Sequence, residues 1–167
     1  MPGSGKSTIG YILADRMSTS FIDIDDLIEV QEGKPLQRIL DEKGYEELRK
    51  REEEVLLSMF RQDTLAKTSG IVMVIATGGS AVYSTKGMLH FRKHARCIYL
   101  NVPLDQIKKR INNFSQRGIA APQSYTIEQI YDERHALYMK YAHDILNVPG
   151  GEDPTNTLER VFALCRS

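Results

Sequence analysis

The sequence has no excess charge of either sign and little cysteine. Lys and Arg together number 22, as do Asp and Glu, so the net charge at pH 7 is zero. Because proteins that bind nucleic acids usually carry a basic surplus to neutralise phosphates, we expect no nucleic-acid partner. Cys97 and Cys165 have no Cys or His near them at metal-ligand spacing, which indicates free thiols in a reducing compartment.

Long apolar runs, internal repeats and linkers are also absent from the sequence. No run approaches the roughly 20 apolar residues that span a bilayer, and the first residues do not have the pattern of a signal peptide. We therefore expect a cytoplasmic protein with no membrane partner. Since nothing divides the 167 residues, we expect a single domain over residues 1–167.

Short apolar segments alternate with segments of helical period. Strands are predicted at 21–24, 71–76, 96–100 and 145–148. Helices are predicted at 6–17, 45–67, 103–113 and 126–141. This alternation predicts an α/β fold in which helices cover both faces of a parallel sheet. Such sheets bind ligands at the carboxyl ends of their strands, so functional residues should follow the strands.

A glycine-rich segment precedes the first predicted helix. It matches the end of the Walker A loop at Gly3, Ser4, Gly5, Lys6, Ser7 and Thr8. Backbone N–H groups of such a loop surround the β-phosphate of a nucleotide, and the following helix directs its positive end at the same charge. Lys6 would reach the β- and γ-phosphates, and the Ser7 hydroxyl would ligate Mg²⁺. The segment predicts a site for ATP and Mg²⁺, with a chance turn before a helix as the alternative.

The Walker A motif is incomplete at its start. Its first glycine would fall immediately before Met1, and the apolar strand that normally leads into the loop is not in the sequence. That strand would be the central one of the sheet, so without it two neighbouring strands would lose hydrogen bonds and the core would have a gap. Our hypothesis is that the working protein carries roughly ten more residues, forming an apolar strand that ends in glycine.

Two carboxylates follow the first predicted strand. Asp23 and Asp25 are two residues apart, so in an extended segment they would point to the same side. Carboxylates near a phosphate loop suit coordination of Mg²⁺ through water and activation of a hydroxyl group. The alternative is an acidic strand end in which Asp26 caps the next helix.

Charged and glycine residues farther along the chain suggest a site for an anionic acceptor. Arg49 and Glu52 are three residues apart and share one face of a helix, and an arginine suits a substrate carboxylate. A solvated charged helix would have the same pattern. Gly78 and Gly79 follow the strand at 71–76, where they would let a ligand approach the backbone closely. A tight turn is the alternative for the glycines.

Taken in order, these motifs resemble the shikimate kinase family. The segments that carry the resemblance are Gly-Ser-Gly-Lys-Ser at 3–7, Phe-Ile-Asp-Ile-Asp at 21–25, the segment from Gly44 through Arg49 to Glu52, Thr-Gly-Gly at 77–79, and Arg-His-Ala-Leu-Tyr at 134–138. The resemblance implies a monomer with the three-layer fold of P-loop NTPases. It also implies transfer of the γ-phosphoryl group of ATP to the 3-hydroxyl of shikimate, a step in aromatic amino-acid biosynthesis.

The resemblance implies roles for residues around the phosphates. Lys6, Asp25 and Arg117 would be catalytic, with Asp25 holding the hydroxyl and helping to remove its proton. Arg117 would lie on a mobile lid at about 112–124 and neutralise charge in the transition state. Asp23 would lie near Mg²⁺, beside Ser7.

Further roles implied by the resemblance concern recognition. Arg49 and Arg134 would bind the shikimate carboxylate, and the glycines at 78–79 would line the pocket. Arg110 and Pro154 would hold the adenine ring between them, and Arg117 would also contact ATP.

Several positions depart from the family pattern. Ser80 stands where the family usually has a third glycine, and Tyr45 and Leu48 replace the usual Glu and Phe near Arg49. The lid at 117–122 also differs from the usual Arg-Pro-Leu. These departures leave open a kinase for another small hydroxy acid, such as gluconate, or a nucleotide-binding module without catalysis.

Overall fold

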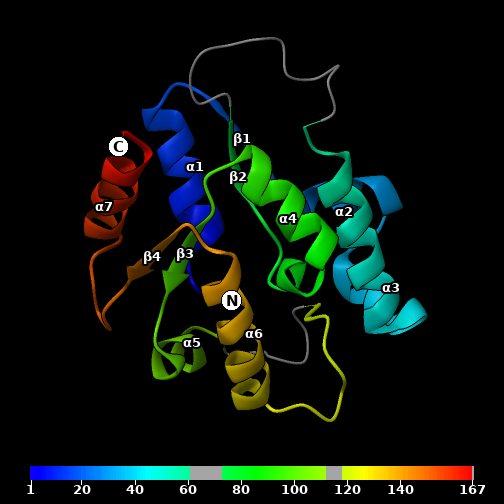
Figure 1. Ribbon diagram of the computed structural model, residues 1–167. Coiled ribbons are helices and arrows are strands. Elements are labelled where there is room, and N and C mark those ends of the chain that lie inside the picture. Colours follow the sequence, from blue (N-terminus) through cyan, green and yellow to red (C-terminus); the bar gives the residue numbers. More distant parts are fainter. Residues whose placement is uncertain (61–72, 112–117, 167) are drawn as a thin grey trace.

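The computed structural model describes residues 1–60, 73–111 and 118–166 (Figure 1). The helices are α1 (Lys6–Arg16), α2 (Ile24–Glu32), α3 (Leu36–Ser58), α4 (Thr85–His94), α5 (Leu104–Arg110), α6 (Ile127–Tyr141) and α7 (Pro154–Arg166), with a short 3-10 helix, η1 (Ala81–Tyr83). The strands are β1 (Ser20–Asp23), β2 (Met73–Ala76), β3 (Ile98–Asn101) and β4 (Asp144–Asn147).

The strands pair in parallel, as the sequence predicted. β1 pairs with β2, with Ser20 opposite Met73, and β3 pairs with β4, with Ile98 opposite Asp144. Within the described ranges these are two separate two-stranded sheets. Helices α1 and α7 lie together on one side, and α2, α3 and α4 lie together on the other, which confirms the α/β architecture (Figure 1).

An apolar cavity of about 510 Å³ lies between the two strand pairs. Its walls include residues 73–76 of β2 and Ile98 and Leu100 of β3. Ile9 and Leu13 of α1 line it as well, and so do Met88 and Phe91 of α4. The cavity lies where the sequence placed a further central strand, and that strand remains a prediction.

Several helix ends follow from short polar signals. Thr126 caps α6 in a capping box with Gln129, which explains why the helix begins at Ile127.

The helix predicted at 45–67 has other bounds in the structure, because α3 begins at Leu36, bends at Gly44 and ends at Ser58. Gly44 has φ of 82°, a conformation that favours glycine. Residues 61–67 of that prediction lie outside the described part of the chain.

The core consists of two clusters of buried apolar side chains. One cluster joins α1, α5, α6 and α7 to β3 and β4, and Ile107 and Ile130 are almost fully buried in it. The other packs α2, α3 and α4 together, around Ile24 and Ile39. None of the described helices has the length and apolar character needed to cross a membrane.

Adding an apolar strand upstream should stabilise the protein. We expect an extension of about six apolar residues and a final glycine before Met1 to fill the cavity and pair with β2 and β3. It would also replace the buried α-ammonium group of Met1, whose pKa burial lowers, by a neutral amide. Thermal unfolding should show a Tm roughly 5 to 10 °C higher, corresponding to about 2 to 4 kcal/mol of added stability.

The control for this prediction is an extension of equal length in which alternate residues are Lys and Asp. Such a segment cannot enter an apolar cavity without burying charge, so its Tm should stay near that of the unextended chain. Equal Tm values for all three proteins would contradict the prediction.

Candidate functional site

The phosphate loop folds around the carbonyl oxygen of Met1. The Ser4 backbone N–H and hydroxyl donate to this oxygen at 3.3 and 2.9 Å, and the Lys6 ammonium group donates to it at 3.1 Å. Gly3 and Gly5 have φ of 73° and 89°, which favours glycine at both positions. Since Gly5 has no side chain to cap α1, the N–H groups of the first helical turn are left for an anion.

The two aspartates have different environments. β1 ends at Asp23 and α2 begins at Ile24, so the prediction that both lie in an extended segment is wrong. Asp23 is itself the cap of α2 and accepts from the Asp25 backbone N–H at 3.0 Å, so the alternative of a cap at Asp26 is also wrong. Asp23 also accepts from the Ser7 hydroxyl at 2.5 Å, which ties it to the phosphate loop.

Lys6 and Asp25 lie together in the interior of the site. Burial lowers the pKa of Lys6, and the carboxylates of Asp25 and Asp23 oppose that shift. Burial also raises the pKa of Asp25 to about 6, against the effect of Lys6. Each group therefore offsets part of the cost of burying the charge of the other.

A cavity of about 360 Å³ connects the phosphate loop with residues from α2, α3 and α6. The charged and hydroxyl residues that line it are Lys6, Ser7, Asp25, Glu52, Ser80 and Arg134. Its other walls are Pro2, Gly3, Ile28, Leu36, Leu48, Gly79, Gly118, Ile119 and Ala120. One opening thus gives access both to the phosphate loop and to acidic and basic groups.

Two arginines converge on one backbone carbonyl beside this cavity. Arg49 Nε and Arg134 Nη2 donate to the Ala120 oxygen at 3.1 and 3.0 Å. The Arg49 guanidinium also lies over the Tyr83 ring, 3.6 Å from its centroid. Only Arg134 lines the cavity, where it is 1% exposed and its Nε has no hydrogen-bond partner among the described residues. Two cations so close together favour a nearby anion.

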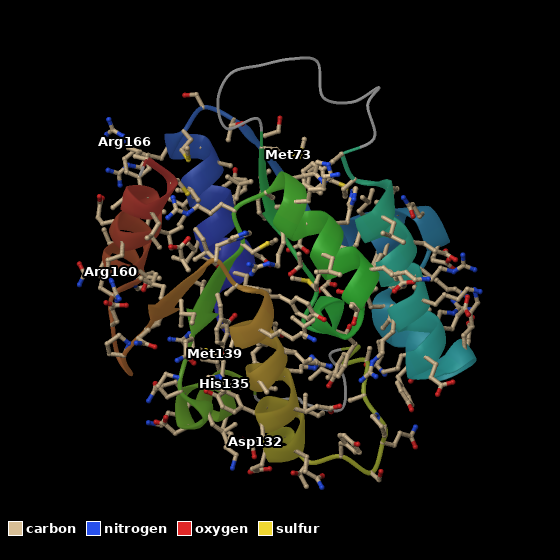
Figure 2. All side chains as sticks on the ribbon, in the orientation of Figure 1. Met73, Asp132, His135, Met139, Arg160 and Arg166 are labelled. Carbon is tan, nitrogen blue, oxygen red and sulfur yellow. The ribbon has the colours of Figure 1, made fainter. Side chains whose placement is uncertain are left out.

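Arg134 is buried on α6, whereas other residues of the same helix are exposed. Asp132 and Met139 are exposed on the same helix, and Figure 2 shows them with His135 among the side chains of α6. The Tyr138 hydroxyl donates to the Gly79 oxygen at 2.6 Å, which ties α6 to the turn after β2. Tyr138 therefore holds the turn in place, in keeping with a packing role rather than stacking on a substrate.

Gly78 and Gly79 are needed because charged side chains lie against them. A Cβ atom at Gly78 would overlap Glu52 Oε1 and Asp25 Oδ1. At Gly79 it would lie 2.8 Å from Arg134 Nη1 and 2.9 Å from Pro2 Cδ. The close approach predicted at these glycines is thus made by the site's own side chains.

Sequence reasoning missed three parts of the site. Glu52 is 2% exposed, and burial raises its pKa to about 7. The helical spacing placed Glu52 on the same face of α3 as Arg49. The charged residues around Glu52 did not show that this face is buried. Tyr83 and the carbonyl of Ala120 had no signal, because neither belongs to a motif.

Arg110 and Pro154 are not among the residues that line the cavity. Arg117 and the first part of the predicted lid lie outside the described residues. Arg110 Nη1 donates to the Gly3 oxygen at 3.3 Å, so it does contact the phosphate loop. Pro154 is exposed at the first position of α7. A role for Arg110 and Pro154 around an adenine ring remains a prediction.

Comparisons with known proteins agree with one another. The family model described as shikimate kinase matches residues 2–162. A shikimate kinase of Sulfurihydrogenibium sp. is 32% identical over 136 residues, which cover 81% of this chain and 77% of that protein. One from Nitrosomonas europaea is 31% identical over 149 residues, which cover 88% of this chain and 67% of the relative.

The fold agrees as well. The structure of shikimate kinase from Acinetobacter baumannii in complex with shikimate has a TM-score of 0.80 at 25% identity, covering 97% of this chain and 87% of that one. The shikimate kinase of Aquifex aeolicus shares the fold with a TM-score of 0.77, over 98% of this chain and 90% of that one, at 23% identity. From its phosphate loop to its last helix, the chain belongs to the shikimate kinase family.

Proposed function

We propose that the protein transfers the γ-phosphoryl group of ATP to the 3-hydroxyl of shikimate. Family membership supports the reaction, and one observation carries its assignment to this site. A single cavity reaches from Lys6 and Ser7 of the phosphate loop to Asp25 and Arg134. A phosphoryl donor and an anionic acceptor could therefore occupy it side by side.

The phosphate loop would bind the donor. The N–H groups at the start of α1 and the ammonium group of Lys6 would hold the phosphates, with Lys6 exchanging the Met1 oxygen for a phosphate oxygen. The hydroxyl of Ser7 and the carboxylate of Asp23 are hard oxygen donors in contact with each other, which suits Mg²⁺. When bound, Mg²⁺ would neutralise phosphate charge during transfer.

Asp25 would act on the acceptor. Its carboxylate lines the cavity beside Lys6 and would accept a hydrogen bond from the 3-hydroxyl. As the bond between the 3-oxygen and the γ-phosphorus forms, the bond to the bridging oxygen of ADP breaks and the hydroxyl proton passes to Asp25. Arg134, with Arg49 behind it at the Ala120 carbonyl, would bind the carboxylate of shikimate.

We also propose that Arg117 neutralises charge on the phosphates in the transition state, as part of the lid.

A kinase for another hydroxy acid, or a nucleotide-binding module without catalysis, is less well supported. Neither accounts for family membership together with an acidic and a basic residue in the cavity.

Replacing Asp25 should slow catalysis far more than it weakens binding. In Asp25→Asn the amide cannot take the hydroxyl proton, so kcat should fall by about 10²- to 10⁴-fold. ADP release can be followed in a coupled assay, and shikimate affinity by calorimetry. Asp26→Asn is the matched control, because Asp26 is exposed on the same turn of α2. A loss of less than about threefold in Asp25→Asn would rule out Asp25 as the general base.

Replacing Arg134 should affect the acceptor rather than the donor. Lys in its place keeps the charge but loses the planar fork, so KM for shikimate should rise by about 10- to 100-fold while KM for ATP changes little. Steady-state kinetics with each substrate varied in turn gives both constants.

Arg38→Lys serves as the control for Arg134→Lys, since the Arg38 side chain is 70% exposed on α3. If Arg134→Lys raised KM for ATP and left KM for shikimate unchanged, the acceptor site would have to lie elsewhere.

A further inference from the structure

The guanidinium group of Arg49 lies against aromatic rings. Arg49 Cζ is 3.6 Å from the centroid of the Tyr83 ring and 5.0 Å from that of the Tyr45 ring. At 3.6 Å the guanidinium group contacts the face of the Tyr83 ring, which attracts cations because it carries the negative part of the ring quadrupole. Tyr83 is thus the closer of the two rings, and its contact limits the orientations open to the guanidinium group.

A hydrogen bond limits the same group in a second way. Arg49 Nε donates to the Ala120 oxygen at 3.1 Å, and Arg134 Nη2 donates to that oxygen at 3.0 Å. Ala120 itself lines the cavity, so Arg49 lies directly behind this wall. Within the described ranges the hydrogen bonding of Arg49 uses Nε alone. Its two Nη groups therefore keep their capacity to bind an anion beside Arg134.

The Tyr83 ring is held from α6, the helix that carries the second arginine. The Tyr83 hydroxyl donates to Glu133 Oε2 at 3.0 Å. Glu133 directly precedes Arg134, whose Cζ is 5.4 Å from the centroid of the same ring. Burial raises the pKa of Tyr83, so its hydroxyl stays protonated at neutral pH and remains a donor. One ring thus lies beside both arginines and is tied to α6.

We propose that Tyr83 is a positioning residue that holds Arg49 beside Arg134, so that two cations rather than one attract the carboxylate of the acceptor. Tyr83 is not among the residues that line the cavity, so it acts through Arg49 and not by touching the acceptor. Without the ring the long side chain of Arg49 would occupy several rotamers, and binding of the acceptor would have to order it. This inference rests on the proposed function, because it concerns the acceptor bound at Arg134.

The test measures KM for shikimate and KM for ATP in two variants of Tyr83. Tyr83→Leu removes the aromatic face, so KM for shikimate should rise by about 5- to 30-fold while KM for ATP changes little. Tyr83→Phe keeps the face and loses only the hydroxyl, so KM for shikimate should stay within about threefold of the unmodified value. Tyr11→Leu is the matched control, because Tyr11 is 66% exposed on α1.

A double-mutant cycle shows whether Tyr83 acts through Arg49. In Arg49→Leu the cation is already missing, so adding Tyr83→Leu should change KM for shikimate by less than about twofold. An equal rise in KM in both backgrounds would overturn the inference, because the ring would then affect the acceptor by another route.

Thermal unfolding of each variant separates positioning from packing. If Tyr83→Leu does not fold, Tyr83→Met takes its place, since Met fills similar space without an aromatic face. A folded variant without the ring that kept the unmodified KM for shikimate would overturn the inference and leave the proposed function intact. Failure of the unmodified protein to bind or phosphorylate shikimate would overturn both.

Discussion

The site depends on a steric constraint at the end of β2, where Gly78 and Gly79 leave room for charged side chains. Asp25 and Glu52 lie against Gly78 and Arg134 lies against Gly79, each within a distance that a Cβ atom would block. These side chains come from three different helices, α2, α3 and α6. Because the turn has no side chains of its own at these positions, three helices can bring their charges to the phosphate loop.

The charges at this turn are buried as a balanced set. Lys6 and Arg134 face Asp25 and Glu52, so each buried charge has an opposite charge close to it. Removal of any one of them would leave the others with an uncompensated partner, which costs more than the pair contributes. The same arrangement suits phosphoryl transfer, in which the protein mainly positions the reactants and stabilises developing charge.

Local patterns made part of the fold and site predictable. The phosphate loop could be predicted because its glycines and Lys6 are neighbours in the sequence. The parallel strands could be predicted because apolar runs alternate with helical segments. The extended geometry predicted around Asp23 was wrong, because the Asp23 side chain caps α2 and the strand ends one residue before its predicted end. Burial of Glu52 depends on packing against Ser80, which lies 28 residues away, so no local pattern revealed it. The monomeric state and the cytoplasmic location stay predictions.

Phosphoryl transfer to one hydroxyl of shikimate can be followed through its products. The most direct measurement is ³¹P NMR of a reaction that contains the protein, Mg²⁺, ATP and shikimate. We expect ADP and one new phosphomonoester signal that couples to the proton on C3 of the acceptor. Formation of ADP and inorganic phosphate alone, or no consumption of ATP by a folded protein that binds it, would show that the protein does not phosphorylate shikimate.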